Sequence, residues 1–195
     1  MAKCGVSYLV ASKLTETDGV ATYEKGMEVA ALVSVKTAIE TNSATLYANN
    51  KLKESVKLFK QGKLTLEIDD LVEDIKAKLL GHTVNVHEGG MTANDPSYTE
   101  VTSNEADIAP FFGVGFYGNT LRDGIWGFRA IWMFKTQFSE PADDMSTRGD
   151  SISLATTTLE NTIYKDDDGN WKTEAFFANE EDAKAWLNTK ALITT

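Results

Sequence analysis

The stretch NSATLYANNKLKESVKLFKQGKLTLEIDDL, residues 42–71, decides the fold of this 195-residue chain. Residues 44–48 include Thr, Leu and Tyr, which suit the pleated and half-buried surface of a β-strand. Asn49-Asn50 interrupts this pattern, and the mostly charged or polar residues 51–57 predict a loop or an exposed arm. Residues 62–68 then alternate between apolar and polar side chains, which is typical of a strand with one solvated face. The stretch therefore predicts two strands joined by a long polar arm.

A helix is predicted directly after this stretch. Asp70 and Glu73 have the spacing of a capping box, in which two polar side chains satisfy N–H groups at the start of a helix. Apolar positions then recur on one helical stripe, at Leu71, Val72, Ile75, Leu79 and Leu80. Gly81 follows them, and glycine commonly ends a helix because it adopts the left-handed conformation.

The rest of the chain is predicted to be mainly β. Strands are expected at residues 6–12, 20–23, 27–35, 111–117, 126–138, 150–164 and 171–177, with 27–35 as a central buried strand. Residues 126–138 are apolar at both parities, which predicts cover on both faces, by the core and by a neighbouring element or subunit.

Two further segments complete this prediction. A C-terminal helix is expected to begin at Asn179, and residues 85–104, rich in Gly, Asn, Thr and Ser, are expected to form a long loop. We expect a mainly β fold of the α+β kind, a β-sandwich or barrel with one helix packed on the sheet and a C-terminal helix. The chain length suits a single domain of residues 1–195.

Composition disfavours several classes of partner. The net charge is −10, whereas a nucleic-acid binder needs a basic footprint and an anionic membrane attracts basic segments. No stretch reaches the ~20 consecutive apolar residues that a membrane-spanning helix needs. The single cysteine, Cys4, leaves no partner for an intrachain disulfide. We therefore expect neither membrane association nor specific binding of nucleic acid.

No catalytic, cofactor-binding or metal-binding residues are predicted. His82 and His87 lack the Cys or carboxylate partners of a zinc site, so both are expected at the surface. The run DDDG at 166–169 lacks the flanking helices and final glutamate of a calcium loop, which favours a β-turn. Acid pairs such as Asp69-Asp70 leave a glycosidase site open by residue type, although caps and turns explain their positions. We expect a protein that is not an enzyme.

The chain contains four tryptophans, Trp126, Trp132, Trp171 and Trp186. Their positions follow the strand and helix periodicity, so packing in the core is the expected role. The alternative is a carbohydrate- or ligand-binding β-sandwich module, in which exposed tryptophans would form a stacking platform.

Several separated segments resemble the major tail proteins of long, non-contractile-tailed bacteriophages, the subunits of the tail tube. In chain order they are SATLYANN (43–50), KLFKQGKLTLEIDDL (57–71), LLGHTV (79–84), FKTQFSEPADDMSTRGDSISLATTTLE (134–160) and the helix around Trp186. The resemblance implies a tube-protein β-sandwich or barrel whose sheets join across subunits. It further implies hexameric rings that stack around a channel for DNA.

The same resemblance implies the partners and the location of the protein. A tape-measure protein would contact it inside the tube, and initiator (distal tail) and terminator proteins would contact it at the tube ends. DNA would pass through the lumen without specific binding, which an acidic surface favours because phosphates are not retained. The protein would be made in the host bacterial cytoplasm and reside in the tail of the virion.

Within this interpretation, residues 48–58 form an extended arm that reaches an adjacent subunit or ring. The arm would be charged and flexible in the free subunit and would become ordered on assembly. The candidate assembly residues are Tyr47, Asn49, Asn50, Lys51, Lys53, Glu54, Lys57 and Phe59. An ordinary mobile hairpin loop is the alternative.

Overall fold

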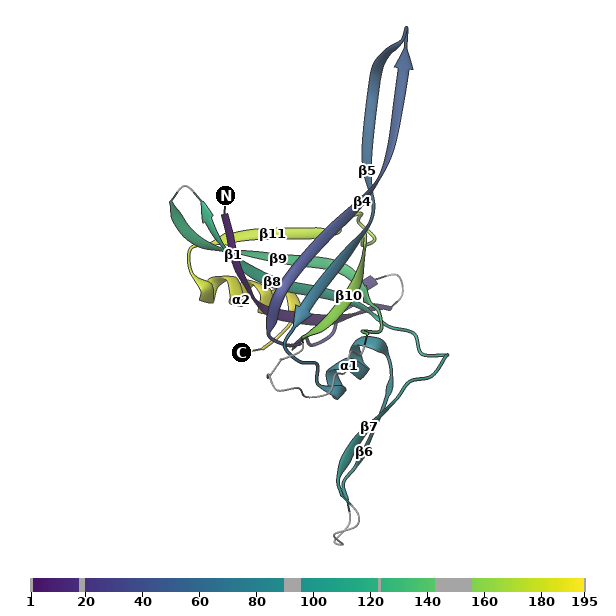
Figure 1. The fold of residues 1–195 in the computed structure, drawn as a ribbon, viewed down its shortest axis with the longest axis vertical. Coiled ribbons are helices and arrows are strands. Elements are labelled where there is room, and N and C mark those ends of the chain that lie inside the picture. The colour runs from purple at the N-terminus through teal and green to yellow at the C-terminus, as the bar shows by residue number, and fades with distance from the viewer. Residues whose placement is uncertain (1, 18–19, 90–95, 123, 143–155, 195) are drawn as a thin grey trace, which may run out of the picture.

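The computed structural model describes residues 2–17, 20–89, 96–122, 124–142 and 156–194. Within these ranges, nine strands form one antiparallel sheet with the order β2-β1-β8-β9-β10-β5-β4, while β3 pairs with β1 and β11 with β9 (Figure 1). The strands are β1 (Ala2–Thr17), β2 (Val20–Tyr23), β3 (Met27–Glu28), β4 (Leu32–Ala48), β5 (Lys51–Ile68), β8 (Phe111–Arg122), β9 (Ile125–Phe138), β10 (Thr157–Tyr164) and β11 (Lys172–Phe177). Two helices, α1 (Glu73–Leu80) and α2 (Glu180–Ala191), accompany the sheet. The predicted mainly β fold with two helices is confirmed.

The main hydrophobic core lies inside the curl of this sheet. The sheet bends so that edge strand β4 comes to face β1, β8 and β9 (Figure 1). The core side chains come from both sides of the curl, with α1 adding to them, and include Leu9, Leu64, Leu66, Ile68, Leu79, Phe112, Val114, Met133, Leu159 and Ile163. Residues 64, 66 and 68 point inward as their alternation predicts, because successive strand residues face opposite sides of the sheet.

A second core fills the opposite face of the sheet, under α2. It contains Val10, Tyr117, Ala130 and Trp132 from the sheet, and Ala183, Leu187 and Ala191 from the helix. Strand β9 serves both cores, since Trp132 faces α2 while its neighbour Met133 faces the inside of the curl. The predicted cover on both faces of this strand is thus provided within one chain.

The apolar run 27–35 does not form the central buried strand that its composition predicts. The strand ends at Glu28 and resumes at Leu32, and β4 lies at the edge of the sheet order. In between, the Ala31 N–H donates to a carboxylate oxygen of Asp69, and the Asp69 N–H donates to the Ala31 carbonyl. The run is apolar because it passes through the main core between its contacts with β1 and its contacts with β5. Val29 is buried there.

Both helices occupy the predicted places, but the first begins differently. Its N-cap is Val72, which provides no side-chain cap, and the Asp70 carboxylate instead accepts a hydrogen bond from the Leu71 N–H. The predicted capping box is therefore wrong. Gly81 ends the helix with φ of 78°, as predicted, and its N–H donates to the Ala77 carbonyl. The C-terminal helix follows Asn179, also as predicted.

Part of the predicted loop 85–104 is β structure. Strands β6 (Thr83–His87) and β7 (Tyr98–Thr102) pair as a separate two-stranded sheet that projects below α1 (Figure 1). Residues 90–95 of this segment lie outside the described residues. So do residues 150–155 of the strand predicted at 150–164, whose described part is β10 (Thr157–Tyr164).

Candidate assembly site

The predicted arm is the outer half of a long β-ribbon formed by β4 and β5 (Figure 1). The two strands pair as far as Ala48 and Lys51, and Asn49 and Asn50 connect them with φ of 53° and 58°. Two successive residues with positive φ are typical of a type I′ turn, whose twist suits a two-residue hairpin. Segment 51–57 is therefore a paired strand, in place of the loop that its polar composition predicts.

Strand β5 has a β-bulge near the base of the ribbon. Glu40 pairs with Gln61 and Thr41 with Phe59, which leaves Lys60 as one extra residue on β5. One extra residue moves every following side chain to the other face of the strand. Leu64, Leu66 and Ile68 consequently point into the core, whereas Val56 and Leu58 point away from the core side. A second extra residue, Lys53, lies between the pairs Leu46–Glu54 and Tyr47–Leu52 and returns Leu52 to the core side.

The outer ribbon consequently has two unlike faces, because residues directly opposite in an antiparallel pair lie on the same side. The pairs Asn42–Leu58, Ala44–Val56 and Leu46–Glu54 define one face, which we call the apolar ribbon face. Its Leu46, Val56 and Leu58 side chains are 55%, 49% and 64% exposed. The opposite face carries Ser43, Thr45, Ser55 and Lys57, with Tyr47 and Leu52 near the tip.

Seven of the eight predicted assembly residues lie exposed on the outer ribbon, and the eighth is tied to the body. The exposed ones are Tyr47, Asn49, Asn50, Lys51, Lys53, Glu54 and Lys57. The Phe59 ring stacks on the Trp171 ring at a centroid distance of 4.9 Å and packs against the main core. Phe59 is thus placed to anchor the base of the ribbon.

Sequence reasoning missed the apolar residues of the outer ribbon. Leu46, Val56 and Leu58 are the large side chains of the apolar ribbon face, and none of them is among the predicted residues. The signal was present, because Leu52 between two lysines and Val56-Lys57-Leu58 alternate with a period of two. That period predicts a strand, and with it a face on which apolar side chains gather.

The outer ribbon is basic in an acidic protein. Lys51, Lys53 and Lys57 stand against one carboxylate, Glu54, which gives the ribbon a net charge of +2 in a chain of net charge −10. The structure shows no ion pair between these lysines and another described residue. Their charge is therefore free to act on another molecule.

A second projection, the β6–β7 hairpin, extends from the opposite end of the molecule (Figure 1). Val86 and Tyr98 expose 66% and 54% of their surface, and the Tyr98 ring stacks on the His87 ring at 4.9 Å. Glu88 and Glu100 lie on the hairpin, so its charge is opposite to that of the ribbon.

His82 lies at the base of this hairpin, in an ionic cluster. Its Nδ1 is 2.8 Å from a carboxylate oxygen of Asp107 and its Nε2 is 3.0 Å from one of Glu140, while Lys76 pairs with Glu140 at 2.8 Å. The side chain is 8% exposed, so the prediction of a surface histidine is wrong for His82. The hydrogen bond to Asp107, followed by that to Glu140, raises the pKa of His82 above its usual value. The cluster joins the end of α1 to two distant segments.

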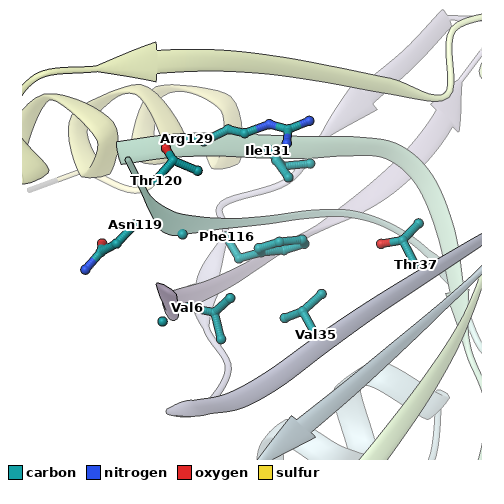
Figure 2. A pocket seen from close by; sticks show the side chains of 10 residues that line it. Val6, Val35, Thr37, Phe116, Asn119, Thr120, Arg129 and Ile131 are labelled. Atoms are coloured by element: carbon teal, nitrogen blue, oxygen red, sulfur yellow. The ribbon is translucent and has the colours of Figure 1, made fainter. Parts of the chain in front are cut away.

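A shallow cleft of about 210 Å³ opens between β4 and the strands β1, β8 and β9 (Figure 2). Its lining is mostly apolar or uncharged, with Val6, Val35 and Phe116 facing one another. Arg129 is the one charged residue in the lining, and its guanidinium pairs with Glu174. The cleft therefore brings together no nucleophile and base of the kind that catalysis requires.

The four tryptophans do not form a binding platform. Trp132 is fully buried beside α2, Trp171 stacks on Phe59, and the Trp186 ring lies 6.1 Å from that of Phe177. Trp126 alone among the four is largely exposed. Core packing, the expected role, therefore accounts for three of them.

Two searches of the described part of the chain gave negative results. No group of three or more His, Cys, Asp or Glu side chains there could hold a metal ion. In the same ranges, no helix combines the length and apolar character needed to cross a bilayer.

Comparison with known proteins agrees with the geometry. A search of curated proteins found no match to the chain. The family model described as phage tail tube protein matches residues 7–118, which is more than half of the chain and includes the whole β4–β5 ribbon, α1 and the β6–β7 hairpin. This protein belongs to the phage tail tube protein family.

Proposed function

We propose that the protein forms hexameric rings that stack into the tail tube of a long, non-contractile-tailed phage. A tail tube protein is a structural component of the virion, and we expect no enzymatic activity from it. Closed rings require head-to-tail contacts, in which two different surfaces of one subunit meet. Rings that stack in one direction also need two unlike surfaces, and the protein has them, since a basic ribbon and an acidic hairpin lie at its two ends (Figure 1).

The β4–β5 ribbon carries this proposal. It stands away from the body and exposes Leu46, Val56 and Leu58 on one side, although apolar side chains on a soluble strand usually face a core. Exposed apolar groups rimmed by polar ones mark interaction surfaces. The candidate assembly residues around Tyr47 and Lys51–Lys57 accordingly contact a neighbouring subunit in the same ring or in the next one.

The remaining proposed contacts, with neighbouring subunits, DNA and other tail proteins, follow from the architecture of a tail tube. Edge strand β4 pairs with β5 on one side, so its other edge suits pairing with a strand of a neighbouring subunit. The acidic net charge suits a lumen through which DNA passes without being held. A tape-measure protein inside the tube, together with initiator or distal tail and terminator proteins at its ends, completes the set of partners. Synthesis takes place in the host bacterial cytoplasm.

The experiment is to follow assembly with and without the outer ribbon. In the shortened variant, Asn-Gly replaces residues 43–57, because Asn42 and Leu58 are directly opposite and Asn-Gly closes a two-residue hairpin. Light scattering with size-exclusion chromatography measures the subunit number, and negative-stain microscopy detects rings and tubes. Wild type is expected to form six-subunit rings and tubes, and the shortened variant to remain a folded, smaller species. A wild type that stays monomeric at millimolar concentration overturns the proposal.

A further inference from the structure

We propose that the tip of the β4–β5 ribbon of one subunit docks on the β6–β7 hairpin of a second copy in the next ring. This inference rests on the proposed tube and assigns its ring-to-ring contact. The occupant of the hairpin surface is thus another copy of this chain, presenting Lys51, Lys53 and Lys57. The receiving surface comprises Glu88 and Glu100 with the exposed rings and side chains around them.

Position in the molecule is the first argument. The ribbon and the hairpin project from opposite ends of the longest axis, one beyond the sheet and the other beyond α1 (Figure 1). When copies stack along that axis in the same orientation, the ribbon end of one meets the hairpin end of the next. Such a contact joins two different surfaces, as a repeating head-to-tail stack requires.

Charge is the second argument. The outer ribbon has three lysines and one glutamate, whereas Glu88 and Glu100 lie on the described part of the hairpin. Asp69 and Asp70 precede α1 at the same end of the molecule and are exposed, so the acidic character continues beyond the hairpin. Unlike charges on two meeting surfaces orient the encounter and accelerate it, while like ends repel. The charge pattern therefore also fixes the direction of stacking.

The third argument is that both projections expose apolar side chains that contact with another element would bury. A two-stranded hairpin is marginally stable in water, because three strands or packing against another element are usually needed. Both projections have this form, and both expose apolar side chains: Leu46 and Leu58 on the ribbon, and Val86 and Tyr98 on the hairpin. Contact between the two projections covers apolar surface on each side and adds strands to each.

Charge reversal tests the contact. The ribbon variant carries Lys51→Glu, Lys53→Glu and Lys57→Glu, the hairpin variant carries Glu88→Lys and Glu100→Lys, and a third variant combines all five. The matched control carries Lys25→Glu, Lys63→Glu and Lys165→Glu, which change the net charge equally at exposed sites of the body. We expect the ribbon and hairpin variants to form rings but to lose stacking at low salt. The combined variant should regain it, and the control should stack like wild type.

Cross-linking tests the contact directly. In a Cys4→Ser background, one batch of protein carries Ser55→Cys on the ribbon and another carries Thr99→Cys on the hairpin, both at exposed positions. A short bismaleimide should join chains in the mixture and not within either batch alone. Cross-links within the Ser55→Cys batch alone would indicate a ribbon-to-ribbon contact and would overturn the proposal.

The outcomes separate this contact from the proposed function. Rings that stack normally despite ribbon reversal, or a combined variant no better than the single-surface ones, overturn the ribbon–hairpin contact and leave the tube subunit intact. Ribbon reversal that changes only retention of added DNA would assign the lysines to nucleic acid and likewise overturn the contact. Mixed cross-links between the two cysteine variants, together with no rings from wild type, support the contact and refute the hexamer. No rings from wild type and no mixed cross-links between the cysteine variants refute both.

Discussion

Removing the apolar ribbon face should abolish assembly at concentrations at which wild type assembles. The variant carries Leu46→Thr, Val56→Thr and Leu58→Thr, three changes on one side of the outer ribbon. Threonine favours the strand conformation and is compatible with solvent, so the ribbon itself should persist. The body should be unaffected, because these side chains lie beyond the bulge at Lys60 and outside both cores.

The magnitude follows from the exposure of these side chains. Full burial of a Leu or Val side chain stabilises by about 1.5–3 kcal/mol. Because about half or more of Leu46, Val56 and Leu58 is still exposed, cover by a neighbouring subunit should contribute about 1 kcal/mol each, or about 3 kcal/mol per contact. Since about 1.4 kcal/mol corresponds to a factor of ten, the concentration required for assembly should rise roughly 100-fold. The entropic cost of association is common to both proteins and cancels in the comparison.

The assay is light scattering against protein concentration, with microscopy of the end products. A matched control carries Val20→Thr, Ile108→Thr and Ile125→Thr, which remove three exposed apolar side chains from the body. Urea unfolding of the unassembled proteins verifies that all variants keep the stability of the body. Assembly of the triple variant at the wild-type concentration would refute the role of this face. An equal defect in the control would show that loss of exposed apolar side chains anywhere on the protein has the same effect.

Three further predictions concern the body. Neither polar atom of the buried Asn161 amide has a hydrogen-bond partner among the described residues, so Asn161→Leu should raise the free energy of unfolding by about 1–3 kcal/mol, measured by urea titration. His82 has a raised folded-state pKa, so its stabilising charge is fully present below the unfolded value of about 6.5 and is lost as pH rises through the folded value. His82→Gln should therefore destabilise most near pH ~5.5 and least near pH ~9, in urea titrations across that range, and an equal loss at both would contradict the cluster. A Cβ at Gly113 would lie 2.3 Å from the Trp132 ring, so Gly113→Ala should lower the melting temperature and destabilise by about 1–3 kcal/mol, with altered tryptophan fluorescence.

Sequence periodicity predicted the elements whose side chains pack in the cores of the single chain. The alternation in residues 126–138 predicts a strand with two covered faces, and β9 (Ile125–Phe138) packs on one core through Trp132 and on the other through Met133. Gly81 marked the end of α1 because a left-handed residue is needed there. These features depend on residues close in sequence, so local chemistry is sufficient to find them.

Amino-acid composition gave the wrong prediction for strands that do not pack against a core. Residues 51–57 and 98–102 are polar enough to resemble loops, yet both are paired strands. Their cross-strand partners supply the hydrogen bonds, and solvent accepts their polar side chains. The turn at Asn49-Asn50 and the alternation of Val56 and Leu58 were the local signs of a ribbon.

Long-range partners were beyond local reasoning. His82 contacts Asp107 and Glu140, which are 25 and 58 residues away in the chain. The residues near His82 in the sequence do not indicate that these carboxylates lie beside it, so His82 was expected at the surface. The same applies to Asp69, which bonds the backbone of Ala31 from 38 residues away.

The extra residue at Lys60 has a consequence for how this protein can diverge. Leu58 and Val56 have the same parity as Leu64 and Leu66, and one inserted position alone sends the two pairs to opposite sides. Because β4 has no extra residue at this place, loss of Lys60 would leave Thr41 opposite Phe59 and every outer pair on the side that it now occupies. Related phages could therefore gain or lose this residue with a change in the local bend and twist of the ribbon, and the ribbon would still present the same side chains to its neighbour.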